Sequence, residues 1–298
     1  MNHSMINAMV SMNGMQQKLD ILANNMANLN TTGFKRKEAT FEDILNNIKE
    51  QPQSFRKEGR LTPLGFNQGW GAKLSQVSTN FQQGTLKDTG VSTDLGIEGD
   101  GLFRVRVPDG DPAQPANILY TRDGSFQLTR LGDTQAAAAG MTDTGNLYLA
   151  NQEGQLLLNE NDNPIAIPEG DKIRVDADGT VWSYSGSNPE ENAVEQGRIG
   201  LVRILRPQFL QQVGDNLFTV PEGIAANPQE LAAIVRPIAQ ETGLDKPISV
   251  KQGFLEQSNV NLADEMTELM MVQRAFQLGS RALTSADTMM SLANNLRG

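Results

Sequence analysis

Two Asp-Thr-Gly triplets are the residues of this sequence that most resemble catalytic groups. They are Asp88-Thr89-Gly90 and Asp143-Thr144-Gly145. Two such triplets are typical of aspartic proteases, in which paired carboxylates share a proton and activate water. Here neither triplet follows a continuous hydrophobic strand, and only 55 residues separate them, too few for two protease lobes. We interpret both as β-turns and predict that the chain is not an enzyme.

Paired aspartates are a second arrangement with chemical potential, because carboxylates bind calcium. Asp176 and Asp178 form a D-x-D-G pattern, and Asp109 and Asp111 form D-G-D. An EF-hand also requires a glutamate at loop position twelve, which the first pair lacks. We interpret these aspartates as turn residues that face water. The chain has no Cys and one His, His3, which excludes thiolate chemistry, histidine triads and multi-His metal sites, so we expect no metal and no cofactor.

No pattern in the sequence favours a phosphate ligand, whether nucleotide or nucleic acid. The glycine-rich stretch GIEGDGLF (96–103) matches neither the phosphate-binding loop nor the dinucleotide fingerprint, since no helix pattern follows it. We interpret it as a tight bend between strands. Net charge is −10 and the pI is about 4.7, whereas nucleic-acid binding needs a basic face. The basic cluster Lys35–Lys37 is followed directly by Glu38. We expect no nucleic-acid partner.

The sequence shows no signal for membrane insertion. No stretch approaches 18 uninterrupted apolar residues, the length needed for a transmembrane helix. The first residues, MNHSMINAMVSMNG, lack a basic region followed by a continuous apolar region. We therefore expect neither membrane insertion nor a cleaved secretory signal peptide.

Composition divides the chain into two similar ends and a different middle. Eleven of the 12 methionines lie in residues 1–34 and 258–298, whereas all 13 prolines and 24 of the 28 glycines lie in residues 35–257. The middle also carries nine of the ten net negative charges. We predict an N-terminal coiled-coil assembly helix (1–34), an extended connecting segment (35–90), a β-rich core domain (91–257) and a C-terminal coiled-coil assembly helix (258–298).

Both ends carry apolar heptad repeats, which are typical of paired helices. Gly33 fits a cap at the end of the first helix, and Asn261 fits a cap at the start of the second. The N-terminal repeat consists of Met5, Met12, Leu19 and Met26, with Ala8, Met15, Leu22 and Leu29 three residues after each. The C-terminal repeat consists of Leu262, Leu269, Phe276, Leu283 and Met290, with the small residues Val272, Gly279, Ala286 and Ala293 between them.

Further apolar residues lie outside these repeats, so each helix needs apolar partners on more than one side. A helical hairpin within one chain, beside a globular domain, remains an alternative explanation of the repeats. The additional apolar residues are Ile21 in the first helix and Met270, Met271, Leu278, Met289, Leu292 and Leu296 in the second.

The pattern of the middle is typical of β-sheet, with short runs rich in Val, Ile, Phe, Tyr and Thr between turn residues. YTRDGSFQL (120–128) and KIRVDADGTVW (172–182) predict hairpins that turn at Asp123-Gly124 and Asp178-Gly179. The predicted fold class is α+β: a mainly β core, rich in Gly and Asp turns, with terminal heptad helices that pair as a coiled coil on assembly. We expect further strands in 95–107, 197–205 and 216–220, and a short helix in 227–236 capped by Asn227.

Three stretches resemble the axial proteins of the bacterial flagellum, namely the rod and hook proteins of the basal body. They occur in the family's order and at about its spacing. Length and the stretch VSTNFQQGTLKDTG (77–90) most resemble the distal rod branch, while 129–156 and 222–247 look like insertions. The three stretches are LDILANNMANLNTTGFKRKEATFED (19–43), LGIEGDGLFRVRVPDG with YTRDGSFQL (95–110 and 120–128), and GFLEQSNVNLADEMTELMMVQRAFQLGSRALTSADTMM (253–290).

The resemblance implies a structural subunit of the rod that assembles helically around the export channel and transmits torque to the hook. Its implied partners are identical copies, neighbouring rod and hook proteins, and the flagellar export apparatus. The implied location is the basal body, reached by export without a cleaved signal peptide. A hook subunit, a proximal rod subunit, or a non-flagellar scaffold of coiled coil and β domain are the alternatives.

The terminal helices are then expected to make the contacts between subunits. Asn24, Asn25 and Asn28 would hydrogen-bond between subunits or face the polar channel, since amides both donate and accept. A solvated polar helix face is the alternative for these asparagines. The predicted assembly interface consists of Met5, Met12, Met15, Leu19, Leu22, Asn24, Asn25, Met26, Asn28, Leu29, Leu262, Leu269, Val272, Phe276, Leu283 and Met290.

Overall fold

The chain folds into two compact units, and the computed structural model confirms the α+β class. Unit 1 combines Met1–Ala27, Lys37–Ser78 and Asn261–Gly298, and unit 2 combines Asn28–Arg36 and Thr79–Val260. The predicted turns at Asp109, Asp111 and Asp143-Thr144 lie outside the described residues. The structure describes residues 2–43, 47–49, 66–68, 72–107, 117–131, 145–186, 193–214, 216–225, 227–238 and 248–296.

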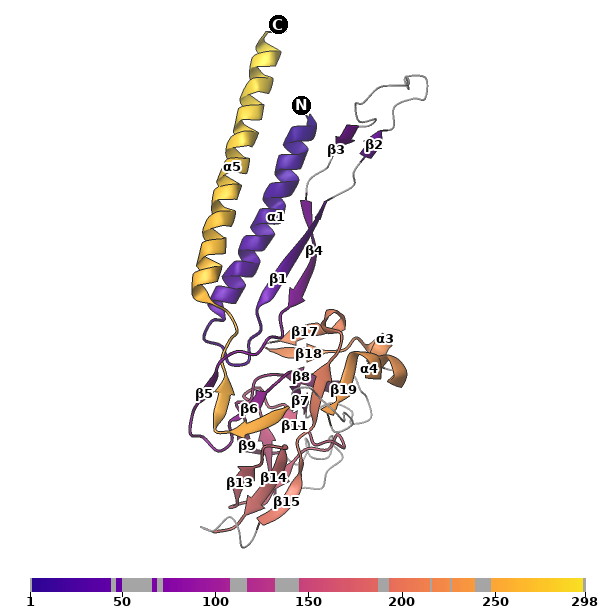
Figure 1. Cartoon of the computed structure of the whole chain (residues 1–298), viewed down its shortest axis with the longest axis vertical. Helices are drawn as coiled ribbons and strands as arrows, with labels where there is room; N and C mark the ends of the chain where they lie inside the picture. Colours follow the sequence, from indigo (N-terminus) through magenta and orange to yellow (C-terminus); the bar gives the residue numbers. More distant parts are fainter. Residues whose placement is uncertain are drawn as a thin grey trace, which may run out of the picture. The chain divides into compact units, whose positions relative to one another are not determined.

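Unit 1 is built from two long helices and paired strands (Figure 1). Helix α1 (Asn2–Ala27) and helix α5 (Leu262–Asn295) run side by side in opposite directions, as the heptad spacing predicted. Strands β1 (Lys37–Asp43) and β4 (Ala72–Thr79) pair with each other, and β1 contacts α1. A second strand pair consists of β2 (Asn47–Lys49) and β3 (Phe66–Gln68).

The start of α5 follows the predicted cap. The Oδ1 atom of Asn261 accepts a hydrogen bond from the backbone nitrogen of Ala263 at 3.0 Å. Asp264 and Glu265 occupy the first turn, where the helix dipole favours acidic groups. Local sequence signals therefore predicted this boundary correctly.

The end of α1 does not follow its predicted cap. The helix ends at Ala27, and the chain continues through turns to Gly33 in unit 2. Gly33 has a φ of +68°, and a Cβ atom on it would lie 2.5 Å from the backbone nitrogen of Asp123. The prediction of Gly33 as a helix cap is wrong, because this glycine serves a close approach inside unit 2. Leu29 likewise lies beyond the helix.

Unit 2 is a β domain whose strands pair antiparallel. Its largest sheet has ten strands, seven of them in the order β12-β10-β11-β7-β8-β18-β17, with β16 on β7, β19 on β16 and β9 on β10. A second sheet has the order β13-β14-β15, and β20-β6 and β21-β5 form pairs. The strands are β5 (Leu86–Asp88), β6 (Leu95–Glu98), β7 (Leu102–Arg106), β8 (Ile118–Thr121), β9 (Gln127–Arg130), β10 (Leu147–Ala150), β11 (Leu156–Leu157), β12 (Ala166–Ile167), β13 (Lys172–Val175), β14 (Thr180–Tyr184), β15 (Ala193–Arg198), β16 (Leu201–Ile204), β17 (Gln211–Gly214), β18 (Leu217–Thr219), β19 (Val235–Pro237), β20 (Ser249–Gln252) and β21 (Phe254–Glu256).

The main core of unit 2 lies where these sheets meet. Phe103 and Phe126 are buried at its centre and pack edge to face, with ring centroids 5.3 Å apart. A smaller cluster surrounds Phe218, beside the short helices α3 (Glu222–Ala225) and α4 (Pro228–Ile234) and the 3-10 turn η3 (Pro207–Phe209). Helix α4 lies within the predicted helix 227–236. Val235 and Arg236 belong to strand β19 instead, and the side chain of Asn227 makes no capping hydrogen bond.

The hairpin predicted at 172–182 is confirmed. Strands β13 and β14 pair with Val175 opposite Val181, and the chain turns at Asp178-Gly179. The side chain of Asp178 accepts hydrogen bonds from the backbone nitrogen and hydroxyl of Thr180. These hydrogen bonds lower the pKa of Asp178, which is the behaviour of a turn aspartate.

The hairpin predicted at 120–128 is wrong. Strand β8 pairs with β7 and β18, while β9 pairs with β10. The side chain of Asp123 accepts two hydrogen bonds from Ser125, so the chain does turn at this point. The strands separate because Arg122 and Phe126 are both drawn into the interior of the unit. Burial of these two side chains therefore overrides the local hairpin signal.

Substitution of Gly124 tests the close crossing that replaces this hairpin. A Cβ atom on Gly124 would lie 1.7 Å from the carbonyl oxygen of Leu95, so Gly124→Ala forces the backbone to move. We expect the free energy of unfolding to fall by about 1–3 kcal/mol, as in overpacked cores. Gly223→Ala is the matched control, because no atom lies within 4 Å of its added Cβ. Equal urea midpoints for the two variants would contradict the crossing.

Candidate functional site

The seam between α1 and α5 is most buried near the end of α1 and the start of α5, and a close approach of the helices lies at Gly279. Leu22 and Val272 are buried, and their neighbours in the heptads are half-buried. A Cβ atom on Gly279 would lie 3.2 Å from Cγ of Met12, so this glycine lets α1 approach α5. Lys18 forms an ion pair with Glu268 at 2.5 Å across the helices.

The predicted asparagine stripe separates into three different environments. Asn25 is 1% exposed, and its amide pairs with both backbone groups of Lys37 at 3.0 Å. The same amide donates to the buried carboxylate of Glu265 at 3.3 Å. Asn25 therefore joins α1 to β1 and α5 within one subunit. Asn24 is exposed on α1, and Asn28 accepts a hydrogen bond from Thr31 in the turn after the helix.

The remaining predicted interface residues lie mainly along the seam. Leu22, Asn25 and Val272 are buried, whereas Asn24 and Leu262 are exposed. The half-buried residues are Met5, Met12, Met15, Leu19, Met26, Asn28, Leu29, Leu269, Phe276, Leu283 and Met290. Most of the predicted set therefore packs α1 against α5 within the subunit.

A larger exposed apolar surface lies on the other sides of α5, and of its residues only Leu262 was in the predicted set. The sequence signal for most of it was the group of apolar residues outside the heptad repeat. Soluble monomers seldom expose so many large apolar side chains on one helix, so this surface indicates an interaction site. Its large exposed residues are Leu262, Met266, Met270, Met271, Leu278, Met289, Leu292 and Leu296.

A mainly apolar hollow of about 450 Å³ adjoins this surface within unit 1. The small residues Gly14, Ala72 and Ala275 line it, with Phe41 and Met271 at its walls. A Cβ atom on Gly14 would lie 3.3 Å from the Ala72 carbonyl oxygen, so glycine allows α1 and β4 to lie close together at this wall of the hollow. Apolar side chains from another molecule are the chemistry that suits such a space.

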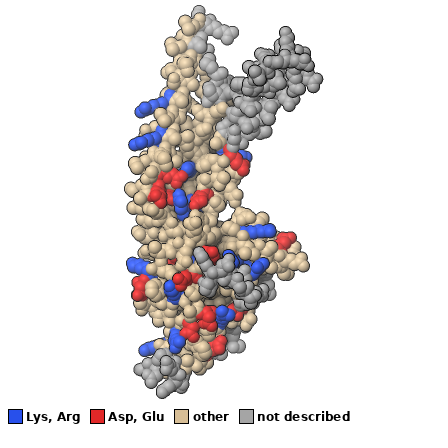
Figure 2. Space-filling view, in the orientation of Figure 1, with Lys and Arg blue, Asp and Glu red and all other residues tan. Residues whose placement is uncertain are grey.

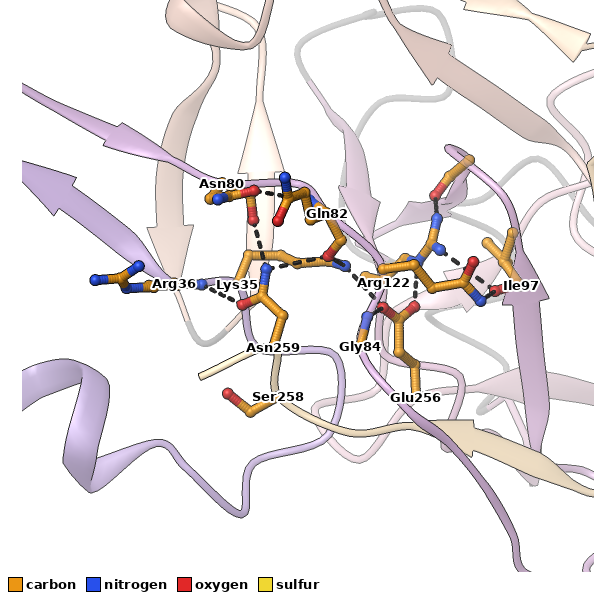
Figure 3. A network of polar contacts seen from close by, with 12 residues as sticks. Lys35, Arg36, Asn80, Gln82, Gly84, Ile97, Arg122, Glu256, Ser258 and Asn259 are labelled. Atoms are coloured by element: carbon orange, nitrogen blue, oxygen red, sulfur yellow. Dashed lines mark hydrogen bonds and ion pairs between the residues drawn. The ribbon is translucent and has the colours of Figure 1, made fainter. Parts of the chain in front are cut away.

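Unit 2 contains a buried polar hub centred on the carboxylate of Glu256 (Figure 3). Its Oε1 atom accepts hydrogen bonds from Lys35 Nζ at 2.7 Å and from the backbone nitrogen of Gly84 at 2.6 Å. Its Oε2 atom forms an ion pair with Arg122. The side chains of Glu256, Lys35 and Arg122 are at most 2% exposed. Three distant segments therefore meet at one carboxylate.

Arg122 extends the hub into the glycine-rich bend that precedes β7. Its guanidinium donates to the carbonyl oxygens of Ile97, Gly99 and Gly101. Gly99 has a φ of +101°, which lets the backbone turn its carbonyl towards the arginine. The stretch 96–103 is thus a bend that binds a side chain of its own chain.

Asn259 adds a second set of contacts to the hub. Its Oδ1 atom accepts from the backbone nitrogen of Arg36 at 2.7 Å, and its Nδ2 atom donates to the carbonyl oxygens of Asn80 and Gln82. Arg36 directly precedes β1, Asn80 directly follows β4, and Asn259 lies three residues before α5. The hub therefore fixes, inside unit 2, the segments that continue into unit 1.

Charged side chains of both signs are interspersed over unit 2 on the face that Figure 2 shows. No continuous basic patch is visible among the described residues on that face. The described residues also contain no group of three or more His, Cys, Asp or Glu that could hold a metal ion. Within the same residues, no helix is both long and apolar enough to cross a membrane.

Comparison with known proteins assigns the family. Residues 5–35 match the profile "Flagella basal body rod protein", residues 96–183 match "Flagellar hook protein FlgE/F/G D1 domain", and residues 251–296 match "Flagellar basal body rod FlgEFG protein C-terminal". "Flagellar basal-body rod protein FlgG" of Borreliella burgdorferi is 33% identical over 289 residues, which cover 96% of this chain and 95% of that relative. The chain belongs to the flagellar basal-body rod family.

Two relatives from one organism show how broad the similarity is. FlgG of Bacillus subtilis is 31% identical over 301 residues, and "Flagellar hook-basal body complex protein FlhP" of the same species is 32% identical over 301 residues. Both alignments cover 100% of each chain. The rod family is structural and non-enzymatic, in agreement with the prediction that the chain is not an enzyme.

Removal of the central carboxylate tests the hub of this rod-family chain. Glu256→Ala leaves two buried cations without their acid, and we expect the free energy of unfolding to fall by about 3–5 kcal/mol. Urea denaturation of the purified chain measures this change. Glu98→Ala is the control, because Glu98 forms an exposed ion pair with Lys251 and its loss should change stability little. Equal effects of the two substitutions would refute the central role of Glu256.

The pKa of Lys35 gives a pH prediction. Burial lowers this pKa below 10.5, and the ion pair with Glu256 only partly opposes the shift. Between the lowered pKa and 10.5 the unfolded chain binds more protons, so Lys35 makes the free energy of unfolding rise with pH. Lys35→Met should remove this contribution. Denaturation midpoints are measured for both proteins from neutral pH to pH 10.5. The midpoint of the wild type minus that of Lys35→Met should increase with pH, and a difference that stays constant would contradict the burial effect.

Proposed function

We propose that this chain is a FlgG-like subunit of the distal rod that assembles helically around the export channel and transmits torque to the hook. The observation that carries the proposal is the exposed apolar surface of α5 in a chain of the rod family. Within one subunit, α1 covers only one side of α5. Addition of further copies would bury the remaining side chains, and burial contributes about 25 cal/mol per Å² of apolar surface.

The helices of unit 1 are proposed as the inner, self-assembling layer. Helix α1 carries little charge, with Lys18 paired to Glu268 and one further acid, Asp20. Stacking many copies of such a surface creates little repulsion between like charges. Half of the large exposed apolar residues of this surface are methionines, whose flexible side chains adapt to neighbours that are not strictly equivalent.

The hub around Glu256 is proposed to carry the load within each subunit. Torque transmission requires that force on unit 2 reach the helices without local unfolding of the connecting chain. Lys35, Gly84 and Asn259 lie on three different connecting segments, and each is bound by buried or partly buried hydrogen bonds inside unit 2. Several short tethers held at one point resist separation better than one flexible linker.

The proposed partners follow from this role. They are identical copies in the rod, neighbouring rod and hook proteins, and the export apparatus, which would move the chain across the envelope without a cleaved signal peptide. The similarity to FlhP supports a second candidate, a related subunit of the hook–basal body complex.

Deletion of the gene in its own host tests the proposal. Electron imaging of the cell envelope is expected to show no hooks or filaments, and at most a short rod stub, because the distal rod would be missing. Complementation with the intact gene is the control. A complete rod without a hook would favour a hook subunit instead. Normal flagella and swimming would overturn the proposed function.

A further inference from the structure

Helix α5 carries a second seam beside the one that packs on α1. Each residue of this outer seam up to Leu292 precedes a position of the heptad seam by one residue, so it faces about 100° further around the helix. Met271, Leu278 and Leu292 in this seam are 60%, 65% and 63% exposed. The seam starts at the apolar hollow and continues to the end of the described helix. The outer seam of α5 consists of Met271, Ala275, Leu278, Ala282, Ser285, Met289, Leu292 and Leu296.

Two arginines border the outer seam of α5. Arg274 and Arg281 are exposed and lie one heptad apart. Neither forms an ion pair with another described residue of the chain. Charges at the edge of a docking surface select the partner and fix its register. The partner of this seam is therefore expected to carry an acid at a matching position.

Helix α1 presents such a face on its side away from α5. Met9 is 65% exposed at one end, and the exposed acid Asp20 lies further along. Asp20 forms no ion pair with another described residue. The remaining residues are small or carry amides, so a second helix can approach them closely. The outer seam of α1 consists of Met9, Asn13, Gln16, Asp20, Ala23 and Ala27, spaced three and four residues apart.

We infer that the outer seam of α1 in one copy of this chain packs on the outer seam of α5 in the next copy. The inference rests on the proposed function, since it requires copies stacked in one direction. The two helices then run antiparallel, as they do within a subunit. Placing Asp20 beside Arg281 fixes the register. At the same register Ala23 lies beside Leu278, Gln16 beside Ser285 and Met9 beside Leu292, while Arg274 lies beside Ala27.

Pairing of α5 with α5 fits the surface less well. A symmetric pair closes a dimer, whereas two different surfaces on one chain extend an open helical assembly. A symmetric pair would also bring Arg274 and Arg281 of both copies to one interface without an acid between them, which is repulsive. The pairing of α1 with α5 avoids both difficulties.

The register also sets a displacement between neighbouring copies. Within a subunit Met12 lies against Gly279, so Met9 is level with about residue 282. In the proposed contact Met9 lies beside Leu292 of the next copy, which is roughly ten residues, or about 15 Å, further along α5. Each α5 would then contact α1 of its own subunit on one seam and α1 of a neighbour on the other.

Disulfide cross-linking tests the pairing without background, because the chain has no cysteine. The double variant Met9→Cys with Leu292→Cys, expressed in place of the native gene, should give a ladder of linked multimers in rods isolated after mild oxidation. A ladder is expected because each copy is joined to two neighbours. Met9→Cys with Met270→Cys is the matched control, since Met270 is exposed on a different side of α5 and should give no ladder.

The outcomes separate this inference from the proposed function. Motile cells whose rods show no ladder would overturn the pairing and leave the rod function intact. Dimers from Leu292→Cys alone would also overturn it, because they would indicate contact between two copies of α5. The double variant could fail to enter the rod although each single cysteine is tolerated. In that case the charge variants described next decide, without cysteines, whether α1 of one copy packs on α5 of the next.

Charge exchange tests the register independently. Asp20→Arg and Arg281→Asp should each raise the concentration needed for assembly roughly tenfold, because like charges then face each other. The double variant Asp20→Arg with Arg281→Asp should restore assembly, which a purely structural role of either residue would not predict. Asp287→Arg, outside the outer seam, is the control. A double variant that assembles no better than the single variants would overturn the register.

Discussion

The carboxylate of Glu256, buried with two cations inside unit 2, is the interaction that brings distant segments of this unit together. Moving one acid and two bases out of water costs desolvation free energy that apolar side chains would avoid. The gain lies in geometry: Lys35, Gly84 and Arg122 come from distant segments and can reach one carboxylate in few arrangements. The hub therefore specifies which segments lie together more than it adds stability.

The two units differ in how far their large apolar side chains are buried. In unit 2 Phe103 and Phe126 are buried in the main core, and the guanidinium of Arg122 binds the carbonyl oxygens of Gly99 and Gly101 at the bend. In unit 1 the apolar residues of α5 exceed what α1 alone covers, and a hollow opens beside Gly14. A buried core maintains the shape of its own unit, whereas large apolar residues left exposed on one helix are suited to contacts with other rod or hook subunits.

The sequence predicts this fold wherever the signal is local. Heptad spacing predicted α1 and α5, and the Asp178-Gly179 turn predicted a hairpin that the structure confirms. Both signals are local, because periodicity and turn chemistry act within a few residues. The hairpin at Asp123-Gly124 failed because Arg122 is drawn to Glu256, a partner 134 residues away. Gly33 failed as a cap for the same reason, since its neighbours are in unit 2. The burial of Asn25 likewise depends on β1 and Glu265, which helical periodicity does not reveal.

Under the proposed rod function, the distribution of charge makes a polymer of so acidic a chain physically reasonable. Net charge accumulates with every added copy, and repulsion would limit growth if the acids stood at the contact surfaces. Residues 1–34 instead carry one base and one acid, and nine of the ten net negative charges lie in residues 35–257. Contacts between helices can then depend on apolar burial, which salt screens little, with single ion pairs that set register. An interface of this kind combines many weak, similar contacts with a few directional ones, and such a combination allows a rod to be stiff and still add its subunits one at a time.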